Sequence, residues 1–373
     1  MINGYFEGNQ AVRIGGAICF QAKSHDNIIS AEFYNNRANA ASGGAIFFRT
    51  VAENNQFEGI FRRNYAVYGG GIFFYNKANN NRFDCDFSFN VANSSGGAIV
   101  FANTTDNNNF TGSFVNNSAL GGGYATDTNG NGGAITFRDV SSNCLFACHF
   151  INNTAAKTGG GVNYRETPHN ITFNSNFINN NALYGGGVNF FESFDNVAFN
   201  GRFIGNSATY GGAIAVKNGA VEDVLFVNNS AKYGGAVYAH DNLNILDCEF
   251  INNTAAQRGG AVYVESHISN CKFDSTFINN TAYQGGAIFF NNETDNNLII
   301  GYFEGNQAER IGGAICFQAK SHDNIISAEF YNNRANAASG GAIFFRNVVE
   351  NNQFEGIFGR QSCCLRCRNL FLQ

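Results

Sequence analysis

The sequence predicts an all-β chain that folds as a right-handed parallel β-helix, a solenoid of about 13 coils with about 26 residues in each. Three observations predict this fold. The phrase F-x-x-N-x-A occurs thirteen times between residues 6 and 335, and a phrase G-G-A/G-I/V follows each copy. Successive marker Phe residues are 23 to 36 residues apart, most often 26 to 28. Short runs in each unit alternate in polarity, which is the period of a β-strand and not of a helix.

The first predicted strand of a unit follows the Gly pair, as in the residues G-G-A-I-F-F at 43–48. Ile46 and Phe48 would point to one face and Phe47 to the other, since side chains alternate along a strand. The Gly pair would permit positive φ or a close approach of two backbones. A leucine-rich repeat is the alternative solenoid, but the L-x-x-L-x-L pattern and any helical stretch are missing.

The other two predicted strands of a unit lead up to the marker Phe. Four residues before that Phe stands an apolar residue, and two residues before it a small one such as Ala31 or Cys85. The apolar residue, the small residue and the marker Phe are two positions apart, so their side chains would lie on one buried face of the strand. The apolar places are Ile29, Phe57, Phe83, Phe110, Phe146, Phe173, Phe199, Leu246, Phe273 and Ile299. The short copy before Phe226 departs from this pattern, with Glu222 in the apolar place.

The marker Asn is expected to form a structural ladder. Asn tolerates the left-handed conformation of tight turns, and amides stacked at one corner of successive coils can hydrogen-bond along the stack. The thirteen residues are Asn9, Asn36, Asn64, Asn90, Asn117, Asn153, Asn180, Asn206, Asn229, Asn253, Asn280, Asn306 and Asn333.

The domain organisation follows from the repeats. We assign residues 1–358 to one repeat array and residues 359–373 to a divergent, Cys-rich tail. Residues 4–61 and 301–358 align without gaps and match at 55 of 58 positions, so the chain contains a long duplication. Because the chain opens in mid-repeat, we interpret the array as a piece of a longer one.

No metal or cofactor site is predicted. Cys363, Cys364 and Cys367 contain one C-x-x-C, but no second Cys pair or His accompanies it. His25 and His322 are copies of one residue beside Asp26 and Asp323, and we interpret both as solvated turns.

Charge and hydropathy exclude two classes of partner. The formal net charge is −5, and the 23 Lys and Arg residues form no basic stripe, so nucleic acid is not an expected partner. No run of 18 apolar residues exists, so we expect no transmembrane helix in this chain.

A candidate adhesive face follows from the strand after the Gly pair. The middle residue of this strand is expected to point outward, and it is not an acid in any repeat. In six repeats it is aromatic: Phe47, Phe73, Tyr238, Tyr263, Phe289 and Phe344. Exposed aromatic patches mark binding surfaces. The alternative interpretation is that a lateral loop covers these rings, or that they only stabilise neighbouring strands. A loop insertion at residues 120–131 is a second candidate for recognition.

The repeated pairing of G-G-A-I with F-x-x-N resembles the repeats of the chlamydial polymorphic outer-membrane proteins. Adhesin-like surface proteins of methanogenic archaea and of some protist parasites are similar in this respect. The resemblance covers residues 1–358 and implies a β-helix presented at the cell surface, as in an autotransporter passenger. It implies an extracellular or cell-surface location, associated with the outer membrane if the source is bacterial.

We therefore expect a non-enzymatic, adhesin-like protein: a rigid β-helical rod that displays loops for attachment. Its partner would be a host-cell or matrix surface molecule, protein or glycan. One alternative is a polysaccharide-active β-helix enzyme, a lyase or a hydrolase, which would need several acids and an Arg in one groove. A purely structural spacer is the other alternative.

Overall fold

A computed structural model describes residues 1–122 and 129–363 of the chain, and all regular structure in these residues is β-strand. The chain divides into two compact units, Met1–Gly201 and Arg202–Gln373. Each unit is a stack of parallel strands that repeats about every 27 residues, with about 13 turns in the chain as a whole. The predicted all-β parallel solenoid is therefore confirmed.

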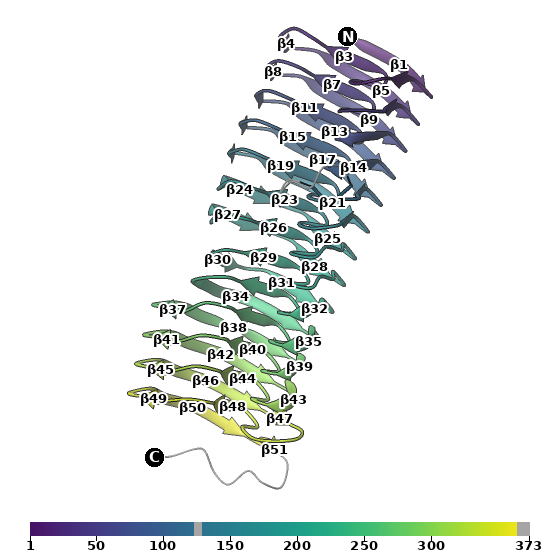
Figure 1. The fold of residues 1–373 in the computed structure, drawn as a ribbon. Helices are drawn as coiled ribbons and strands as arrows, with labels where there is room; N and C mark the ends of the chain where they lie inside the picture. Colours follow the sequence, from purple (N-terminus) through teal and green to yellow (C-terminus); the bar gives the residue numbers. More distant parts are fainter. Residues whose placement is uncertain (123–128, 364–373) are drawn as a thin grey trace. The chain divides into compact units, whose positions relative to one another are not determined.

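A regular turn contains four kinds of strand in a fixed order, and the turns at residues 169–204 lack the lead-in and corner strands. A two-residue lead-in strand precedes a long strand that carries the marker Phe, a corner strand follows the marker Asn, and a three-residue Gly-pair strand follows the Gly pair. In unit 1 the long strands β1 (Ile2–Glu7), β5 (Ile28–Tyr34), β9 (Gln56–Arg62) and β13 (Arg82–Ser88) stack one on another (Figure 1).

The further long strands of unit 1 are β17 (Asn109–Val115), β21 (Leu145–Ile151), β24 (His169–Phe173), β25 (Asn176–Ile178) and β27 (Asp195–Phe199). Those of unit 2 are β28 (Arg202–Ile204), β30 (Gly219–Glu222), β31 (Leu225–Val227), β34 (Leu243–Ile251), β38 (Lys272–Ile278), β42 (Leu298–Glu304), β46 (Ile325–Tyr331) and β50 (Gln353–Gly359). Where a turn is irregular, two shorter strands replace one long strand.

The Gly-pair strands form the second face. In unit 1 they are β3 (Ile18–Phe20), β7 (Ile46–Phe48), β11 (Ile72–Phe74), β15 (Ile99–Phe101), β19 (Ile135–Phe137), β23 (Val162–Tyr164) and β26 (Val188–Phe190). In unit 2 they are β29 (Ile214–Val216), β33 (Val237–Ala239), β36 (Val262–Val264), β40 (Ile288–Phe290), β44 (Ile315–Phe317) and β48 (Ile343–Phe345).

The corner strands of unit 1 are β2 (Gln10–Ala11), β6 (Arg37–Ala38), β10 (Tyr65–Tyr68), β14 (Val91–Ser95), β18 (Ser118–Ala119) and β22 (Thr154–Ala155). Those of unit 2 are β32 (Ser230–Tyr233), β35 (Thr254–Arg258), β39 (Thr281–Gln284), β43 (Gln307–Ile311), β47 (Arg334–Ala335) and β51 (Ser362–Cys363). The lead-in strands are β4 (Ser24–His25), β8 (Ala52–Glu53), β12 (Ala78–Asn79), β16 (Thr105–Asp106), β20 (Ser141–Ser142), β37 (Ile268–Ser269), β41 (Thr294–Asp295), β45 (Ser321–His322) and β49 (Val349–Glu350).

Like side chains lie on top of one another in the core. The marker ring of Phe33 stacks on that of Phe61 with centroids 4.7 Å apart, and Phe250 stacks on Phe277 at 4.8 Å. Rings of the Gly-pair strands stack in the same way, such as Phe48 on Phe74 at 4.8 Å. Each such pair contributes about 0.5–1.5 kcal/mol beyond the burial of its surface. The stack is therefore stabilised turn by turn.

One predicted core residue is wrong. Leu246 is only partly buried, and Ile245 takes its place inside the core at 0% exposure. The register shifts between Leu246 and Cys248, where Asp247 has φ 52°. Such a bulge inserts one extra residue. The side chains before the bulge therefore point to the opposite face, and the spacing of residues alone does not reveal this change.

Twelve of the thirteen marker asparagines lie buried, Asn9 in the first turn is exposed, and neighbouring marker asparagines bond to one another within each unit. In unit 1 the Nδ2 of Asn36 donates to Oδ1 of Asn64 at 3.0 Å, and the same bond links each neighbouring pair from Asn9 to Asn180. In unit 2 it links each neighbouring pair from Asn206 to Asn333. The second Nδ2 hydrogen donates to the marker Phe carbonyl of the preceding turn, and Oδ1 also accepts from a backbone N–H. All four bonding positions of the amide are thereby used.

The left-handed conformation lies one residue earlier than we predicted. Among the residues that the structure describes, no marker Asn has positive φ, whereas Asn35, Asn116 and Asn279 just before three of them do, with φ 53°, 55° and 54°. The turn residue and the ladder residue are thus separate. The turn residue faces solvent, and its sharp reversal directs the next side chain into the core.

A second asparagine ladder lies at the corner before the long strands, and the sequence interpretation missed it. Asn27, Asn55, Asn81 and Asn108 bond in series through Nδ2 and Oδ1 at 2.9–3.0 Å in unit 1. Asn297, Asn324 and Asn352 repeat the arrangement in unit 2 at 2.8–2.9 Å. The overlooked signal was an Asn two residues before the apolar place, following another Asn or Asp.

The two glycines of a Gly pair serve different needs. In the triplet at residues 69–71, Gly69 has φ +63°, which side chains disfavour. A Cβ on Gly70 would lie 2.3 Å from the carbonyl oxygen of Gly97 in the next turn. A Cβ on Gly71 would lie 3.0 Å from its nearest neighbour, and Ala stands at this third place in adjacent turns, as Ala45 and Ala98.

Two sequence predictions fall partly outside the described residues. Residues 123–128 of the insertion at 120–131, and Cys364 and Cys367 of the tail, are not described.

The first residues of the predicted tail continue the stack. Gln361 takes the ladder position by accepting a bond from the backbone N–H of Asn333 at 3.1 Å, and β51 pairs with β47. The repeat geometry thus continues five residues past 358, and the separate tail stays a prediction.

Replacing one ladder residue should destabilise its neighbourhood. Asn280→Ala removes the acceptor of two bonds from Asn253 and the donor of bonds to Asn306 and to the carbonyl of Phe250. We expect a loss of roughly 2–4 kcal/mol, because each buried polar group left unpaired costs about 1–3 kcal/mol. Hydrogen exchange of the flanking turns measures this loss. The control Asn279→Gly, at the exposed neighbour with φ 54°, should leave exchange almost unchanged.

The glycine triplet offers a test of backbone approach. Gly70→Ala should lower the thermal unfolding midpoint, because overpacking against backbone costs about 1–3 kcal/mol. Gly71→Ala, one residue along, should have little effect. Equal effects of the two substitutions on unfolding followed by circular dichroism would contradict the assignment.

The buried cysteines among the described residues should resist alkylation in the folded chain. Seven described cysteines are free, and burial raises the pKa of Cys148, Cys248 and Cys316 to about 12. The thiolate is the reacting form, so these three should remain unlabelled near pH 8. Cys19 is partly exposed and should react first. Peptide mapping after iodoacetamide treatment gives the order, and labelling of Cys148 as fast as Cys19 would be inconsistent with this core.

Candidate functional site

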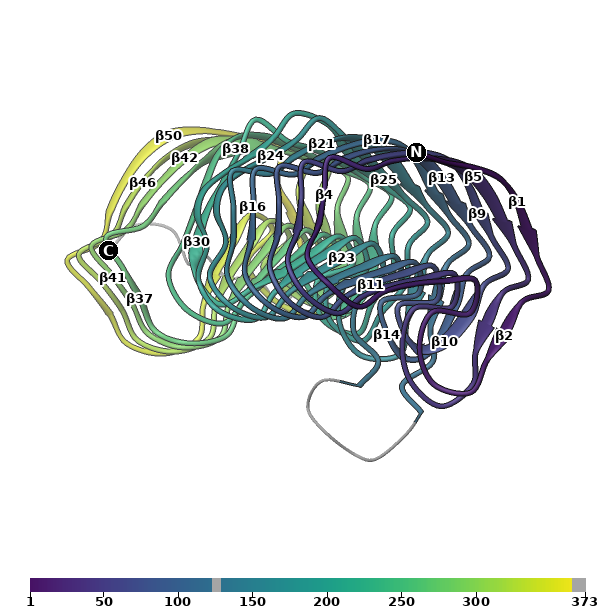
Figure 2. The same ribbon diagram turned by 90° about the horizontal axis from the view of Figure 1, so that it is seen from above.

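The predicted aromatic face is covered. In unit 1, Phe47 and Phe73 are only 5% and 4% exposed, and together with Val100 they form a cluster outside the Gly-pair strands. Ile14 and Tyr68, from the segments before the Gly pairs, pack against this cluster, as does Cys19, the register partner of Phe47 on β3. Figure 2 shows why: corner strands β10 and β14 lie on the side of β11 that faces away from the long strands.

The same cover exists in unit 2. The ring of Tyr210 meets that of Tyr238 edge-on at 5.2 Å, and the rings of Tyr233 and Tyr263 lie 5.3 Å apart. The guanidinium of Arg258 lies 4.9 Å from the ring centre of Phe289. The hydroxyl of Tyr238 donates to Glu265, whose pKa burial raises.

The expectation of an exposed aromatic patch at these six positions is therefore wrong. Phe47, Phe73, Tyr238, Tyr263 and Phe289 are buried, and Phe344 is half-buried. At these positions, the segment before the Gly pair folds back and makes a second, lateral core. Large residues directly before the Gly pair, such as Tyr68, Tyr233 and Arg258, were the signal for this cover.

An open groove lies instead on the outer face of the long strands of unit 2. It has a volume of about 650 Å³ and crosses the five strands β34, β38, β42, β46 and β50. Its floor is the middle of each strand, where the small inward residues are Cys248, Ser275, Gly301, Ala328 and Gly356. The walls come from the residues on either side of that middle position. One groove is thus assembled from successive turns.

Glycine lets the backbone of two strands form this floor. Gly301 has φ +125° and Gly356 has φ +135°, conformations that side chains disfavour. A Cβ on Gly301 would lie 2.1 Å from the carbonyl oxygen of Ser275. Neither strand could keep this conformation with a larger residue in the middle position.

Carboxylates dominate the walls of the groove. Asp247, Glu249, Asp274 and Glu329 line it, and no Arg or Lys is among the lining residues that the structure describes. Lys272 approaches from outside, with its Nζ 2.8 Å from Asp274 Oδ2. The groove therefore presents a negative surface that attracts cationic groups.

Apolar surface alternates with these acids. Ile300, Tyr302 and Ile357 also line the groove. The Tyr302 hydroxyl donates to Glu304 at 2.8 Å, and this bond raises the pKa of Tyr302. The rings of Tyr302 and Tyr331 lie 5.6 Å apart. The walls thus combine charge with flat aromatic surface.

The duplication places a related groove in unit 1. It has a volume of about 460 Å³ and is lined by Asn3, Gly4, Tyr5, Ser30, Ala31, Glu32, Glu58 and Gly59. Tyr5, Glu32 and Gly59 are the counterparts of Tyr302, Glu329 and Gly356 at the offset of 297 residues. Both copies therefore carry the groove on the same structural element.

The groove lacks part of what a polysaccharide lyase needs. Acids and an Arg converging in one place would support catalysis, and here four acids converge without Arg among the lining residues.

Within the described chain, no helix is long and apolar enough to cross a membrane.

Comparisons with curated proteins and with solved structures found no match. Five stretches match the family model for the Chlamydia polymorphic membrane protein repeat: residues 3–21, 223–240, 247–265, 274–291 and 301–318. Each stretch contains a marker Phe, its ladder Asn and the following Gly pair. The matched segments are therefore the parts of a turn that build the ladder and close the coil, and at these five places the chain carries repeats that match the Chlamydia polymorphic membrane protein family.

Proposed function

We propose that this chain is a non-enzymatic, adhesin-like protein of the cell surface, and that it attaches to a host-cell or matrix molecule through the outer face of its long strands. The acidic groove across β34 to β50 carries this proposal, because it is open, crosses five turns and combines carboxylates with tyrosine. The family of the repeats supports an outer-membrane or surface location.

The chemistry of the groove favours an extended, cationic partner. Turns in a parallel sheet repeat at about 4.8 Å, so five turns offer a track of roughly 20 Å. Carboxylates along such a track complement Lys and Arg side chains of an extended protein segment. An anionic glycan would be repelled, whereas a neutral glycan could stack on Tyr302.

A binding assay with matched variants tests this function. The purified chain should bind cells saturably, and Asp247→Asn combined with Glu249→Gln and Glu329→Gln should weaken binding about tenfold or more, through loss of charge complementarity. Rising salt should weaken wild-type binding in the same direction, since exposed charges are screened.

The control removes three exposed acids outside the groove, with Glu166→Gln, Glu222→Gln and Glu309→Gln. It should bind like the wild type. Absence of saturable binding by the wild type would favour a structural spacer. Turnover of pectin-like or other glycans, with Ca²⁺ added, would favour the enzyme alternative and overturn the proposal.

A further inference from the structure

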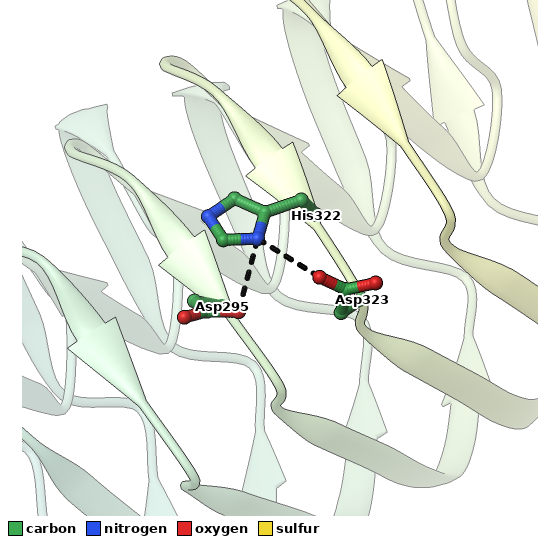
Figure 3. A group of neighbouring side chains, drawn as sticks. All are labelled: Asp295, His322 and Asp323. Carbon is green, nitrogen blue, oxygen red and sulfur yellow. Dashed lines mark hydrogen bonds and ion pairs between the residues drawn. The ribbon is translucent and has the colours of Figure 1, made fainter.

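Two neighbouring turns of unit 2 bring three metal-ligating side chains together. Strands β41 and β45 pair in register, with Asp295 opposite His322, and Asp323 follows directly. The Nδ1 of His322 lies 3.0 Å from Asp295 Oδ1 and 3.2 Å from Asp323 Oδ2. Figure 3 shows this nitrogen directed at both carboxylates and the other ring nitrogen directed away from them.

These separations fit a small, tetrahedrally coordinated cation. Bonds of about 2.0–2.1 Å from Zn²⁺ to nitrogen and oxygen place neighbouring ligand atoms about 3.3–3.4 Å apart. The two measured separations are within about 0.4 Å of that edge, and all three ligand atoms lie within 4.8 Å of one another. Small adjustments of the two carboxylate side chains would bring these three ligand atoms to three corners of a tetrahedron.

Burial supports a built site and not three solvated side chains. The side chains of His322 and Asp295 are only 24% and 25% exposed. Asp295 Oδ1 is buried and makes no hydrogen bond of good geometry to a described residue, and its 3.0 Å contact with His322 Nδ1 is an ion pair only if that ring is protonated. Asp323 is 44% exposed, which leaves one side open for water as a fourth ligand. A buried carboxylate oxygen without a hydrogen bond needs a cation beside it.

The charged residues nearby leave the site negative. The Lys320 ammonium is held by Glu350, with Nζ 3.0 Å from Oε2. Glu350 is the register partner of His322 on the next turn. The competing account is a protonated His322 that makes two ion pairs without a metal.

The duplication supplies an internal comparison. His25 and Asp26, the copies of His322 and Asp323, lie 2.9 Å apart but are 60% and 68% exposed. In the described part of the chain, no carboxylate from a preceding turn joins them, and Asp295 lies outside the duplicated stretch 301–358. On the following turn, Glu53 pairs with Lys23 at 3.0 Å. Among the described residues, the group that could hold a metal ion is therefore the one at Asp295, His322 and Asp323 and not the one at His25 and Asp26.

We propose that Asp295, His322 and Asp323 form a binding site for Zn²⁺ or a similar transition-metal dication. Imidazole and carboxylates are the ligands that such ions accept. Because the ligands come from two turns, the bound cation would link β41 to β45 and stabilise the stack at these two turns. The predicted absence of a metal site treated His322 and Asp323 as a solvated turn and did not pair them with Asp295 on the preceding turn.

The test is Zn²⁺ binding by the untagged, chelator-treated chain, followed by calorimetry and by the ring-nitrogen NMR signals of its six histidines. We expect one site per chain and a shift of His322 Nδ1 alone. Asp295→Asn and His322→Gln should each weaken binding about tenfold or more, as expected for loss of a ligand. Zn²⁺ should raise the thermal midpoint of the wild type but not of Asp295→Asn.

His25→Gln is the matched control and should bind Zn²⁺ like the wild type. An equal loss in His25→Gln and His322→Gln, or similar NMR shifts at several histidines, would mean adventitious binding and overturn the proposal. No binding by the wild type would leave the ion-paired imidazolium as the correct account. The NMR measurement on the wild type decides the matter even if a variant fails to fold.

Discussion

The buried asparagine ladder is the constraint on which the rest of this structure depends. A ladder amide makes bonds to the turn above it, to the turn below it and to a Phe carbonyl, and all of these bonds are inside the core. An unpaired buried amide is costly, so each turn places an amide side chain at the same height and corner, an Asn in most turns and Gln361 in the last one described. The ladder thereby fixes the register of every neighbouring turn within a unit.

The fixed register aligns equivalent residues of successive turns on the surface. Once Phe61 must lie on Phe33, the residues that flank the inward positions also line up from turn to turn. Acids that are about 27 residues apart in sequence, such as Asp247 and Asp274, then share one groove. The same alignment brings Asp295 beside His322. Both candidate sites of this chain are consequences of stacking, and no single repeat contains either of them.

The sequence predicts the stacked repeat far better than it predicts which residues are covered on the sides of the stack. Period, marker Phe and Gly pair were sufficient to predict parallel stacked turns, because they recur in every unit. The outward aromatic residues were misjudged, because burial of Phe47 or Tyr263 depends on how the segment before the Gly pair folds back. Ile245 replaced Leu246 in the core because a bulge at Asp247 changes the face without changing the spacing. The groove and the Asp–His–Asp cluster depend on contacts between turns, which one repeat does not encode.

Hydrogen exchange of the asparagine side-chain amides, followed by NMR, tests the ladder most directly. The account predicts that the Nδ2 protons of residues such as Asn64 and Asn280 exchange as slowly as the backbone amides of the same turns. The amides of exposed asparagines such as Asn279 should exchange rapidly in the same sample. Rapid exchange at Asn64 and Asn280, at the rate of Asn279, would contradict the buried ladder and with it the fixed register of the turns.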